Sequence, residues 1–340
     1  MKASRGFESH LLRHLREAEI GTDRLFGRNQ SLWFSGEISE TDHLLSIGYE
    51  APELIGQNPV FGIRAYRHQI NKGAVLNFDT VSCGAVPYLR WTLGGGTEVM
   101  AGVAYSHDTI SNLPAGGSAI LRPDAGDRDR LALRLGISRG FAMPQASWGV
   151  TGQAELTQDI AVTSRDTSFL VSQGSLSMQA THPGGAVRVS GALTGGTVQM
   201  LRGNSNVGDR FFLGQSLVRG FAFGGIGPVD QSVAGSPALG GNSYVGAQFD
   251  FRFPGAIPGA AKFTPGLFAD AGSVFGLNTI AGDPAGLNAV DDGLHLRASI
   301  GLSLSYDTGF GEISAYVGQA VLKQTNDRTE QIQVSFGAKF

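Results

Sequence analysis

Two charged residues, Arg219 and Asp270, have surroundings that favour an ion pair inside the fold. Arg219 stands in Val218-Arg219-Gly220-Phe221, within a segment of about 202–240 that is rich in Gly and Phe and lacks strand or helix periodicity. A structureless loop of this length is usually functional or disordered, and disordered segments avoid aromatic residues. We therefore predict a folded loop that packs into the protein, although a lone loop arginine is more often a solvated surface charge.

The proposed partner lies in Phe268-Ala269-Asp270-Ala271-Gly272, whose alternate residues place Phe268, Asp270 and Gly272 on one face of a strand. A planar guanidinium can bind a carboxylate through two hydrogen bonds, and Phe268 could add a cation–π contact. Gly220 would let the loop backbone come close to the strand. The expected chemistry is non-covalent bracing of a loop, and the alternative is two unrelated charges that are each solvated.

Other kinds of site have little support in the sequence. Gly224-Gly225-Ile226-Gly227 lacks dinucleotide-binding spacing, Gly94-Gly95-Gly96-Thr97 lacks the lysine of a phosphate loop, and no G-x-S-x-G motif occurs. A hydrolase would need a distant Ser–His pair, for example around His295, but nothing singles one out. The single cysteine, Cys83, excludes an internal disulfide. We therefore expect no catalytic residues, no metal site and no cofactor.

The composition excludes several classes of protein. Of 340 residues, 50 are Gly and only 16% are charged, and the net charge of −3 leaves no basic surface for nucleic acid. The sequence contains no run of about 18 apolar residues, so it does not predict a transmembrane helix. Residues 1–20 carry basic residues throughout and do not resemble a secretory signal. If the protein is secreted, we expect that its true N-terminus lies upstream.

Period-two alternation is the strongest pattern, and it recurs from end to end. Its apolar and polar faces include the following pairs of sets: Leu131, Leu133, Leu135 and Ile137 against Arg130, Ala132, Arg134, Gly136 and Ser138; Val245, Ala247, Phe249, Phe251 and Phe253 against Tyr244, Gly246, Gln248, Asp250 and Arg252; Leu294, Leu296, Ala298, Ile300, Leu302, Leu304 and Tyr306 against His295, Arg297, Ser299, Gly301, Ser303 and Ser305; Ile332, Val334, Phe336, Ala338 and Phe340 against Gln331, Gln333, Ser335, Gly337 and Lys339. A soluble β-sandwich also alternates. Three features favour a membrane β-barrel instead. The polar faces consist mostly of Gly, Ser, Gln and Arg, the chain has no clear helical segment, and its last residue, Phe340, is aromatic.

The alternation predicts an all-β protein, a transmembrane antiparallel barrel of about 16 strands with a long loop folded into its lumen. Candidate strands cover 15–23, 31–40, 42–50, 59–70, 79–93, 96–111, 128–140, 146–161, 168–181, 185–201, 241–254, 262–275, 293–306, 311–322 and 329–340. Bacterial single-chain barrels have even strand numbers, so we expect one more strand, either from 1–12 or absent from this chain. Residues 1–14 form an atypical N-terminal segment, 15–340 the barrel, and about 202–240 the lumen loop.

Several motifs of the chain resemble those of a known family. Val-Arg-Gly-Phe followed by an F-x-D-x-G strand is similar to the paired signature of the BamA-like outer-membrane insertase superfamily, also called the bacterial surface antigen family. Further resemblance is found in the following segments: Leu25-Phe26-Gly27-Arg28-Asn29, Gly225-Ile226-Gly227-Pro228, Leu239-Gly240-Gly241-Asn242, Gly309-Phe310-Gly311 and Glu330-Gln331.

The resemblance implies a sixteen-stranded barrel in the outer membrane of a Gram-negative bacterium, which folds and inserts other outer-membrane barrels without ATP or covalent chemistry. The implied partners are unfolded outer-membrane proteins, the lipid bilayer and assembly-machinery lipoproteins, the last through periplasmic domains missing from this chain. Phe336 and Phe340 would form the terminal-strand signal. The family's first barrel strand is also missing, Asp307-Thr308-Gly309-Phe310-Gly311 replaces its usual S-P-F-G-P turn, and Ala338 stands where an aromatic residue is often found.

Two other functions remain open from the sequence. The first is a sibling translocator that secretes a polypeptide through the lumen, and the second is a passive diffusion pore. Linked periplasmic domains would distinguish the translocator, and a large steady conductance would indicate the pore.

Overall fold

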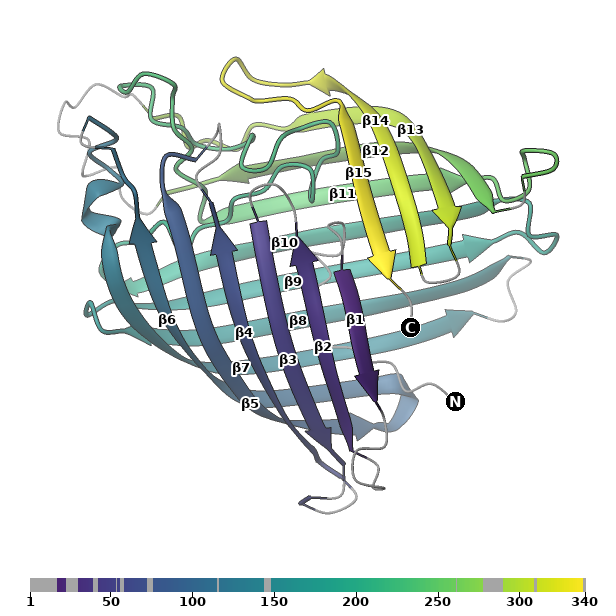
Figure 1. The fold of residues 1–340 in the computed structure, drawn as a ribbon, viewed down its shortest axis with the longest axis horizontal. Helices are drawn as coiled ribbons and strands as arrows, with labels where there is room; N and C mark the ends of the chain where they lie inside the picture. The colour runs from purple at the N-terminus through teal and green to yellow at the C-terminus, as the bar shows by residue number, and fades with distance from the viewer. Residues whose placement is uncertain are drawn as a thin grey trace.

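Fifteen strands form a closed barrel in the structure, a computed structural model (Figure 1). The structure describes residues 17–22, 30–38, 42–52, 54–55, 58–71, 76–114, 116–143, 148–260, 262–277, 290–308 and 311–338. The strands are β1 (Glu17–Thr22), β2 (Ser31–Ile38), β3 (Asp42–Ala51), β4 (Val60–Ile70), β5 (Asp79–Leu93), β6 (Thr97–Ser111), β7 (Gly126–Met143), β8 (Gly149–Thr163), β9 (Ser168–Thr181), β10 (Arg188–Arg202), β11 (Ser243–Arg252), β12 (Phe263–Phe275), β13 (Arg297–Asp307), β14 (Gly311–Leu322) and β15 (Ile332–Ala338). Two short 3-10 turns, η3 (Gly94–Gly96) and η4 (Arg122–Asp124), lie between strands.

Each strand pairs antiparallel with the next, so the all-β antiparallel barrel predicted from the alternation is confirmed. About sixteen strands were expected, and the described residues contain fifteen. In an up-and-down barrel, the first and fifteenth strands run in the same direction. β1 and β15 therefore pair in parallel, through Glu17 and Gly337. Residues 1–12, the suggested source of another strand, lie outside the described residues.

Several strands start later than the alternation predicted, and the structure gives a reason for two of them, β13 and β15. The register of β12 with β13 ends at the pair Gly272 and Arg297, and the residues before Arg297 form a loop. β15 begins at Ile332 because Thr329 and Glu330 pair with the long loop instead, as described below.

The three longest connections, 112–125, 203–242 and 276–296, leave the barrel at one end. Because the strands alternate in direction, the connections 71–78, 112–125, 203–242, 276–296 and 323–331 all leave the barrel at the same end. Connections at the other end include the three-residue turn η3. Membrane barrels have long extracellular loops and short periplasmic turns, so the three longest connections mark the extracellular end, at the upper left of Figure 1.

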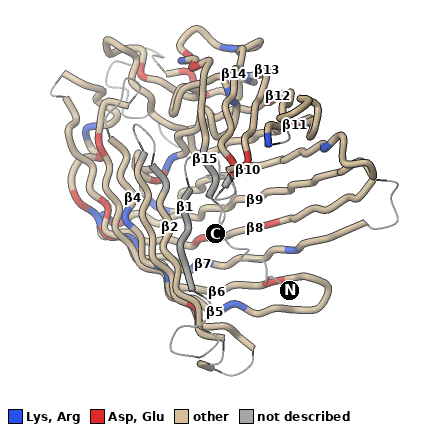
Figure 2. Tube along the Cα trace, turned by 45° about the vertical axis from the view of Figure 1, so that its right-hand side comes forward, with Lys and Arg blue, Asp and Glu red and all other residues tan. Residues whose placement is uncertain are grey.

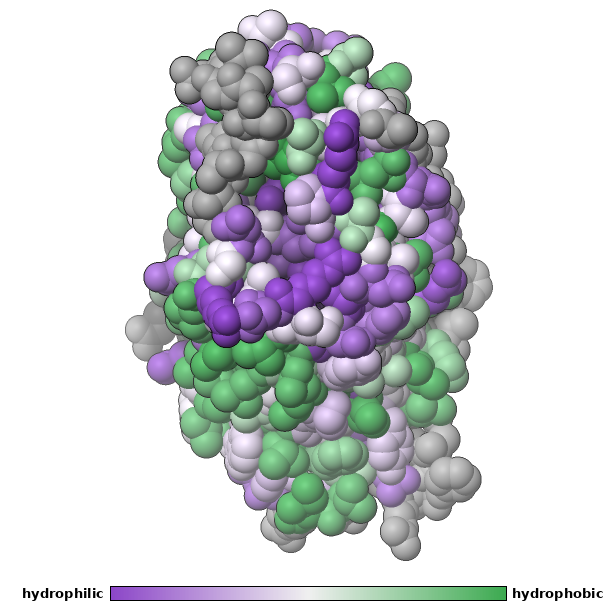
Figure 3. All heavy atoms as spheres, turned by 90° about the vertical axis from the view of Figure 1, so that its left-hand side faces the viewer, coloured by the Kyte–Doolittle hydropathy of each residue, from purple (hydrophilic) through white to green (hydrophobic). Residues whose placement is uncertain are grey.

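The outer surface of the wall is apolar, whereas the lumen carries the polar side chains. On β7, for example, Leu131, Leu133 and Leu135 are exposed, whereas Ala132 and Ser138 are buried. Hydrophobic side chains cover the lower part of the face shown in Figure 3, below a hydrophilic band. Charged residues are separated by long uncharged stretches along the strands in Figure 2. This arrangement matches a lipid-facing band around a polar interior.

No helix among the described residues is long and apolar enough to span a membrane.

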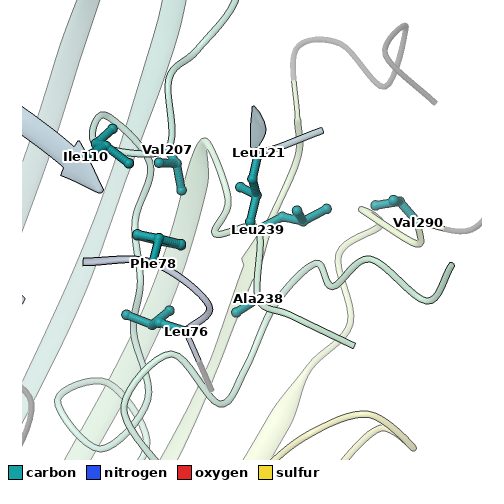
Figure 4. Close-up of a cluster of buried hydrophobic side chains, with 8 residues drawn as sticks. All are labelled: Leu76, Phe78, Ile110, Leu121, Val207, Ala238, Leu239 and Val290. Carbon is teal, nitrogen blue, oxygen red and sulfur yellow. The ribbon is translucent and has the colours of Figure 1, made fainter. Parts of the chain in front are cut away.

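Buried hydrophobic side chains from several separate connections pack together at the extracellular end (Figure 4). The cluster consists of Leu76, Phe78, Ile110, Leu121, Val207, Ala238, Leu239 and Val290. Three of these residues belong to the long connection 203–242, so the cluster fixes that connection to the loops around it. The lower part of the same connection reaches the candidate site.

Candidate functional site: the lumen loop and its arginine

The connection between β10 and β11, residues 203–242 and called the lumen loop here, is an ordered hairpin-like fold. Isolated bridges join Phe211 to Gly241 and Val229 to Ala238, which brings the two arms of the loop together. Near its lower end, the backbone N–H groups of Leu217 and Val218 both donate to the carbonyl of Gly214. This turn presents the motif Val218-Arg219-Gly220-Phe221 to the wall.

Two wall glycines make room for Leu217, which comes just before the motif. A Cβ atom on Gly246 would lie 2.2 Å from the Leu217 side chain, and one on Gly272 would lie 2.9 Å from it. Leu217 is 1% exposed and packs in a cluster that includes Val218 and Phe221. Burial of these apolar groups anchors the motif against β11 and β12.

Arg219 and Asp270 lie together, and both are almost completely buried, at 4% and 3% exposure. Nε of Arg219 donates to Oδ2 of Asp270 at 2.7 Å, and Nη2 donates to Oδ1 at 2.7 Å. The backbone N–H of Arg219 adds a third bond to Oδ2 at 2.9 Å. The fork of the guanidinium thus matches the carboxylate in the bidentate way expected from the sequence.

Asp250 on β11 is a second carboxylate partner that the sequence reasoning did not single out. Nη1 of Arg219 donates to its Oδ1 at 2.7 Å, and Nη2 donates to its Oδ2 at 3.2 Å. Burial acts to lower the pKa of Arg219, but the hydrogen bonds and charge of Asp270, and then those of Asp250, outweigh it and raise the pKa. Arg219 therefore keeps its charge. The alternation places Asp250 on the lumen face, but it gives no sign that Arg219 lies beside it.

Two aromatic rings complete the surroundings of the guanidinium. Cζ of Arg219 lies 4.1 Å from the centroid of the Phe268 ring and 5.2 Å from that of Tyr316. The two rings meet edge to face with centroids 6.0 Å apart. Phe268 therefore lies on the lumen face as predicted, and Tyr316 on β14 adds a second wall to the site. Cation–π contacts in desolvated surroundings contribute about 2 kcal/mol or more.

Gly220 has a positive φ of 91°, and it approaches Gly318 on β14. A Cβ atom on Gly318 would lie 3.1 Å from the Gly220 Cα and 3.2 Å from the Phe268 ring. The positive φ strongly favours glycine at position 220, and the missing side chain at position 318 lets the loop backbone lie against the wall. The close backbone approach expected at Gly220 is thus present.

A second arginine holds the other end of the lumen loop, with the charges reversed. Arg128 of β7 donates from Nη1 and Nη2 to the two carboxylate oxygens of Asp209 in the loop, both at 2.7 Å. The side chains are 2% and 0% exposed. Nη2 of Arg128 also lies 3.2 Å from Oδ2 of Asp108 on β6. The sequence gives no sign of this anchor, because Asp209 and Arg128 stand in no recognisable motif.

The remaining predicted residues are placed as follows. Val218 and Phe221 are both 0% exposed within the loop, and Gly272 is buried beside Leu217. His295 contacts the carboxylate of Asp291 at 2.8 Å in the connection before β13, with 37% of its side chain exposed. Phe340 and the side chain of Phe336 lie outside the described residues. In the part of the chain that the structure describes, no group of three or more His, Cys, Asp or Glu could hold a metal ion.

The arrangement offers charge pairing, hydrogen bonding and apolar packing. Its physical effect is to fix a long loop to two opposite parts of the lumen wall, β11–β14 through Arg219 and β6–β7 through Asp209.

Residues 24–340 match the model of the Omp85 superfamily domain, which is nearly the whole chain. The chain belongs to the Omp85 superfamily. Together with the barrel, membership of the Omp85 superfamily places this protein in the bacterial outer membrane. The family resemblance seen in the motifs is therefore confirmed.

Individual relatives of this Omp85 barrel are distant. The outer membrane protein assembly factor BamA of Neorickettsia risticii is 27% identical over 135 residues, which is 40% of this chain and 17% of that protein. The structure of BamA from Haemophilus ducreyi lacking POTRA domains 1–3 superposes with a TM-score of 0.73 at 17% identity, covering 94% of this chain and 66% of the other. CdiB from Acinetobacter baumannii gives a TM-score of 0.58 at 15% identity, covering 94% and 55%. The chain thus spans less than two thirds of the length of these relatives.

Proposed function

We propose that this Omp85 barrel is the membrane domain of an outer-membrane protein assembly factor, which folds other β-barrel proteins and inserts them into the outer membrane. The curated relative carries that function in its name. The structural likeness to BamA is also closer than the likeness to CdiB, with TM-scores of 0.73 and 0.58. The proposed activity involves strand pairing and membrane insertion, without covalent chemistry.

The observation that carries the proposal is the seam between β1 and β15. Among the described residues this seam consists of the single parallel pair Glu17 and Gly337. Every other neighbouring pair of strands shares six or more residue pairs, with six between β1 and β2 and seven between β14 and β15. A weakly paired strand edge is a template for pairing with another chain. An incoming strand could therefore add to the seam by β-augmentation.

In this proposal the lumen loop supports the barrel while the seam opens. Arg219 attaches the loop to β11 and β12, and the Arg128–Asp209 pair attaches it to β7. These contacts cross the lumen and do not involve β1. A barrel braced from inside can loosen at one seam and keep the rest of its wall in place.

The proposed partners are unfolded outer-membrane proteins and the lipid bilayer. Assembly-machinery lipoproteins would act through periplasmic domains linked to such a barrel. The name of the curated relative, an outer membrane protein assembly factor, supports the first of these partners.

A passive diffusion pore fits the structure less well. The lumen loop and the hydrophobic cluster occupy the extracellular end of the lumen, and two buried arginine–aspartate pairs hold the loop there. A large steady conductance of the purified barrel in planar bilayers would favour the pore. The polypeptide translocator shares the barrel fold, and transport of an unfolded chain across a vesicle membrane would favour it over insertion.

A disulfide across the seam tests the insertase directly. The pair Glu17→Cys and Gly337→Cys, in a Cys83→Ser background, would close the seam when oxidised. The assay follows the folding rate of an unfolded outer-membrane barrel into lipid vesicles that contain this protein. We expect the reduced form to accelerate folding, the oxidised form to lose the acceleration, and reductant to restore it.

A matched control places the two cysteines away from the seam, at Ala18 and Gly36, which are partners in the β1–β2 register. Oxidation of this control pair should leave the acceleration intact. Equal acceleration by the oxidised and reduced seam variants, or none by the reduced protein, would overturn the proposal.

A further inference from the structure

The lumen loop contacts the last strand as well as the wall around Arg219. The side-chain amide of Gln333 on β15 forms two hydrogen bonds with the motif. The backbone N–H of Gly220 donates to Oε1 of Gln333 at 3.2 Å, and Nε2 of Gln333 donates to the carbonyl of Phe221 at 3.0 Å. Gln333 is 8% exposed, so these bonds form away from bulk water.

Glutamine suits this position for a chemical reason. Its amide carries a donor and an acceptor, which satisfy one backbone N–H and one backbone C=O of the loop at the same time. Leucine would satisfy neither group, and glutamate would satisfy only the N–H. A buried backbone group that loses its partner incurs the cost of desolvation.

The chain that leads into β15 is joined to the same part of the loop. Phe221 forms an antiparallel bridge with Thr329. The N–H of Glu330 donates to the carbonyl of Gly220 at 3.0 Å, and the N–H of Ala222 donates to the carbonyl of Arg328 at 2.9 Å. The N–H of Arg328 in turn donates to the carbonyl of Gly225 at 2.9 Å. Residues 220–225 and 328–330 therefore form a short ladder directly before β15.

The connection between β14 and β15 is fixed on its other side by β13. Arg297 binds the Asp327 carboxylate through Nε and Nη2, with a shortest distance of 2.8 Å and side chains 4% and 2% exposed. Asp327 also accepts a hydrogen bond from the backbone N–H of Gln324 at 2.7 Å. The connection can hence transmit a displacement of the lumen loop to β15, because its own shape is held by these bonds.

We propose that Gln333 is a positioning residue that couples the Arg219 loop to the seam strand β15, so that docking of the loop controls how firmly β15 stays in the barrel. This role rests on the proposed function, since it converts the position of the loop into mobility at the seam. The motif then has two sets of contacts. Arg219 holds the β11–β12 side, and Gly220 and Phe221 hold β15.

Hydrogen–deuterium exchange of the purified full chain in detergent micelles tests the coupling without any substrate protein. The quantity measured is the exchange rate of the β15 backbone amides, residues 332–338. Gln333→Leu removes two buried hydrogen bonds, so we expect exchange in β15 to accelerate roughly three- to thirtyfold. Gln333→Glu keeps the acceptor for Gly220 and should give a smaller acceleration. Gln331→Leu is the matched control, because the Gln331 amide bonds to the exposed side chain of Gln319 instead of the loop.

A second comparison distinguishes coupling from a local packing effect. Arg219→Ala should also accelerate exchange in β15, although Arg219 pairs with Asp250 and Asp270 on other strands. The double variant should exchange little faster than the faster single variant, because both changes release the same loop. Arg134→Ala removes a bidentate pair with Asp159 elsewhere in the wall and should leave β15 unchanged.

Retention of the heat-modifiable folded band on unheated gels shows for each variant that the barrel has formed. Unchanged β15 exchange in folded Gln333→Leu, or in folded Arg219→Ala, would overturn the coupling. The outcome is separate from the insertase test, since exchange is measured without substrate. A coupled loop in a barrel that fails to accelerate folding would contradict the proposed function and leave the coupling itself intact.

Discussion

Removal of Arg219 should release the lumen loop from the wall while the barrel still forms. The change Arg219→Ala deletes four side-chain hydrogen bonds, two to Asp270 and two to Asp250. It also leaves the Asp270 side chain, which is 0% exposed, without its cation. The wall strands pair through their own backbones, so the effect should fall on the docking of the loop.

The size of the effect follows from burial. Breaking a buried ion pair on one side costs roughly 3–5 kcal/mol, and loss of the contact with Phe268 adds to this. Because the Asp250 side chain is 18% exposed, water can reach part of the site, and we expect a value near the lower limit. About 3 kcal/mol corresponds to roughly a hundredfold rise in the population of undocked loop.

Limited proteolysis of the folded barrel in detergent measures this population. Chymotrypsin is suitable because Phe211, Phe212, Phe221 and Phe223 in the loop are unchanged by the substitution. Cleavage tracks the open population when opening and closing are faster than cutting. Arg202→Ala is a matched control at the base of the same loop, since Arg202 and Asp166 form a pair with 67% and 71% exposure. Exposed pairs contribute about 0–1 kcal/mol, so cleavage should change little.

A double-mutant cycle with Asp270→Ala tests whether the two residues act through the same interaction. Asp270→Ala should release the loop less than Arg219→Ala does, because Asp250 still pairs with the arginine. The double variant should be little worse than Arg219→Ala alone, with a coupling free energy of about 1–3 kcal/mol. Strictly additive losses, or a loop that stays as protected in Arg219→Ala as in Arg202→Ala, would refute the reasoning.

Three further predictions use other parts of the chain. Arg128→Ala leaves the buried Asp209 carboxylate without its ion-pair partner, so chymotrypsin should cut the loop near Phe211 at least tenfold faster (~1.4 kcal/mol). Cleavage at the rate of the Arg202→Ala control would contradict this. Gly318→Ala brings a Cβ atom to 3.1 Å from the Gly220 Cα and should displace the loop motif around Arg219. Gly140→Ala on β7, where nothing lies within 4 Å of the added atom, should leave the motif in place. Equal protection of the loop in the two variants would show that the close approach of Gly220 to Gly318 is unimportant. Deletion of Phe340, expected from the sequence to close the apolar face of the last strand at the membrane interface, should lower the amount of assembled barrel in cells more than the stability of barrel already folded. Normal assembly of the deletion variant would reduce Phe340 to a hydrophobic terminus.

The sequence by itself determined the wall of this protein. Alternation with period two assigns each side chain to the lipid or to the lumen, since successive residues of a strand point to opposite faces. The exposed Leu131, Leu133 and Leu135 and the buried Ser138 on β7 follow that rule. Asp270 and Phe268 could be placed in the lumen for the same reason. A carboxylate is disfavoured against lipid, so only one face was open to Asp270.

Only the tertiary structure decided which lumen groups meet. The alternation put Asp250 and Gln333 on the lumen face, but it contains no information on how far a loop of residues 203–242 descends or which strands it touches. Those contacts depend on the register between strands and on the closed circumference of the barrel, which bring Asp250 beside Phe268 and Gln333 beside Tyr316. The late start of β15 has the same origin. The predicted strand 329–340 included Thr329 and Glu330, yet the backbone groups of these two residues pair with Phe221 and Gly220 of the loop.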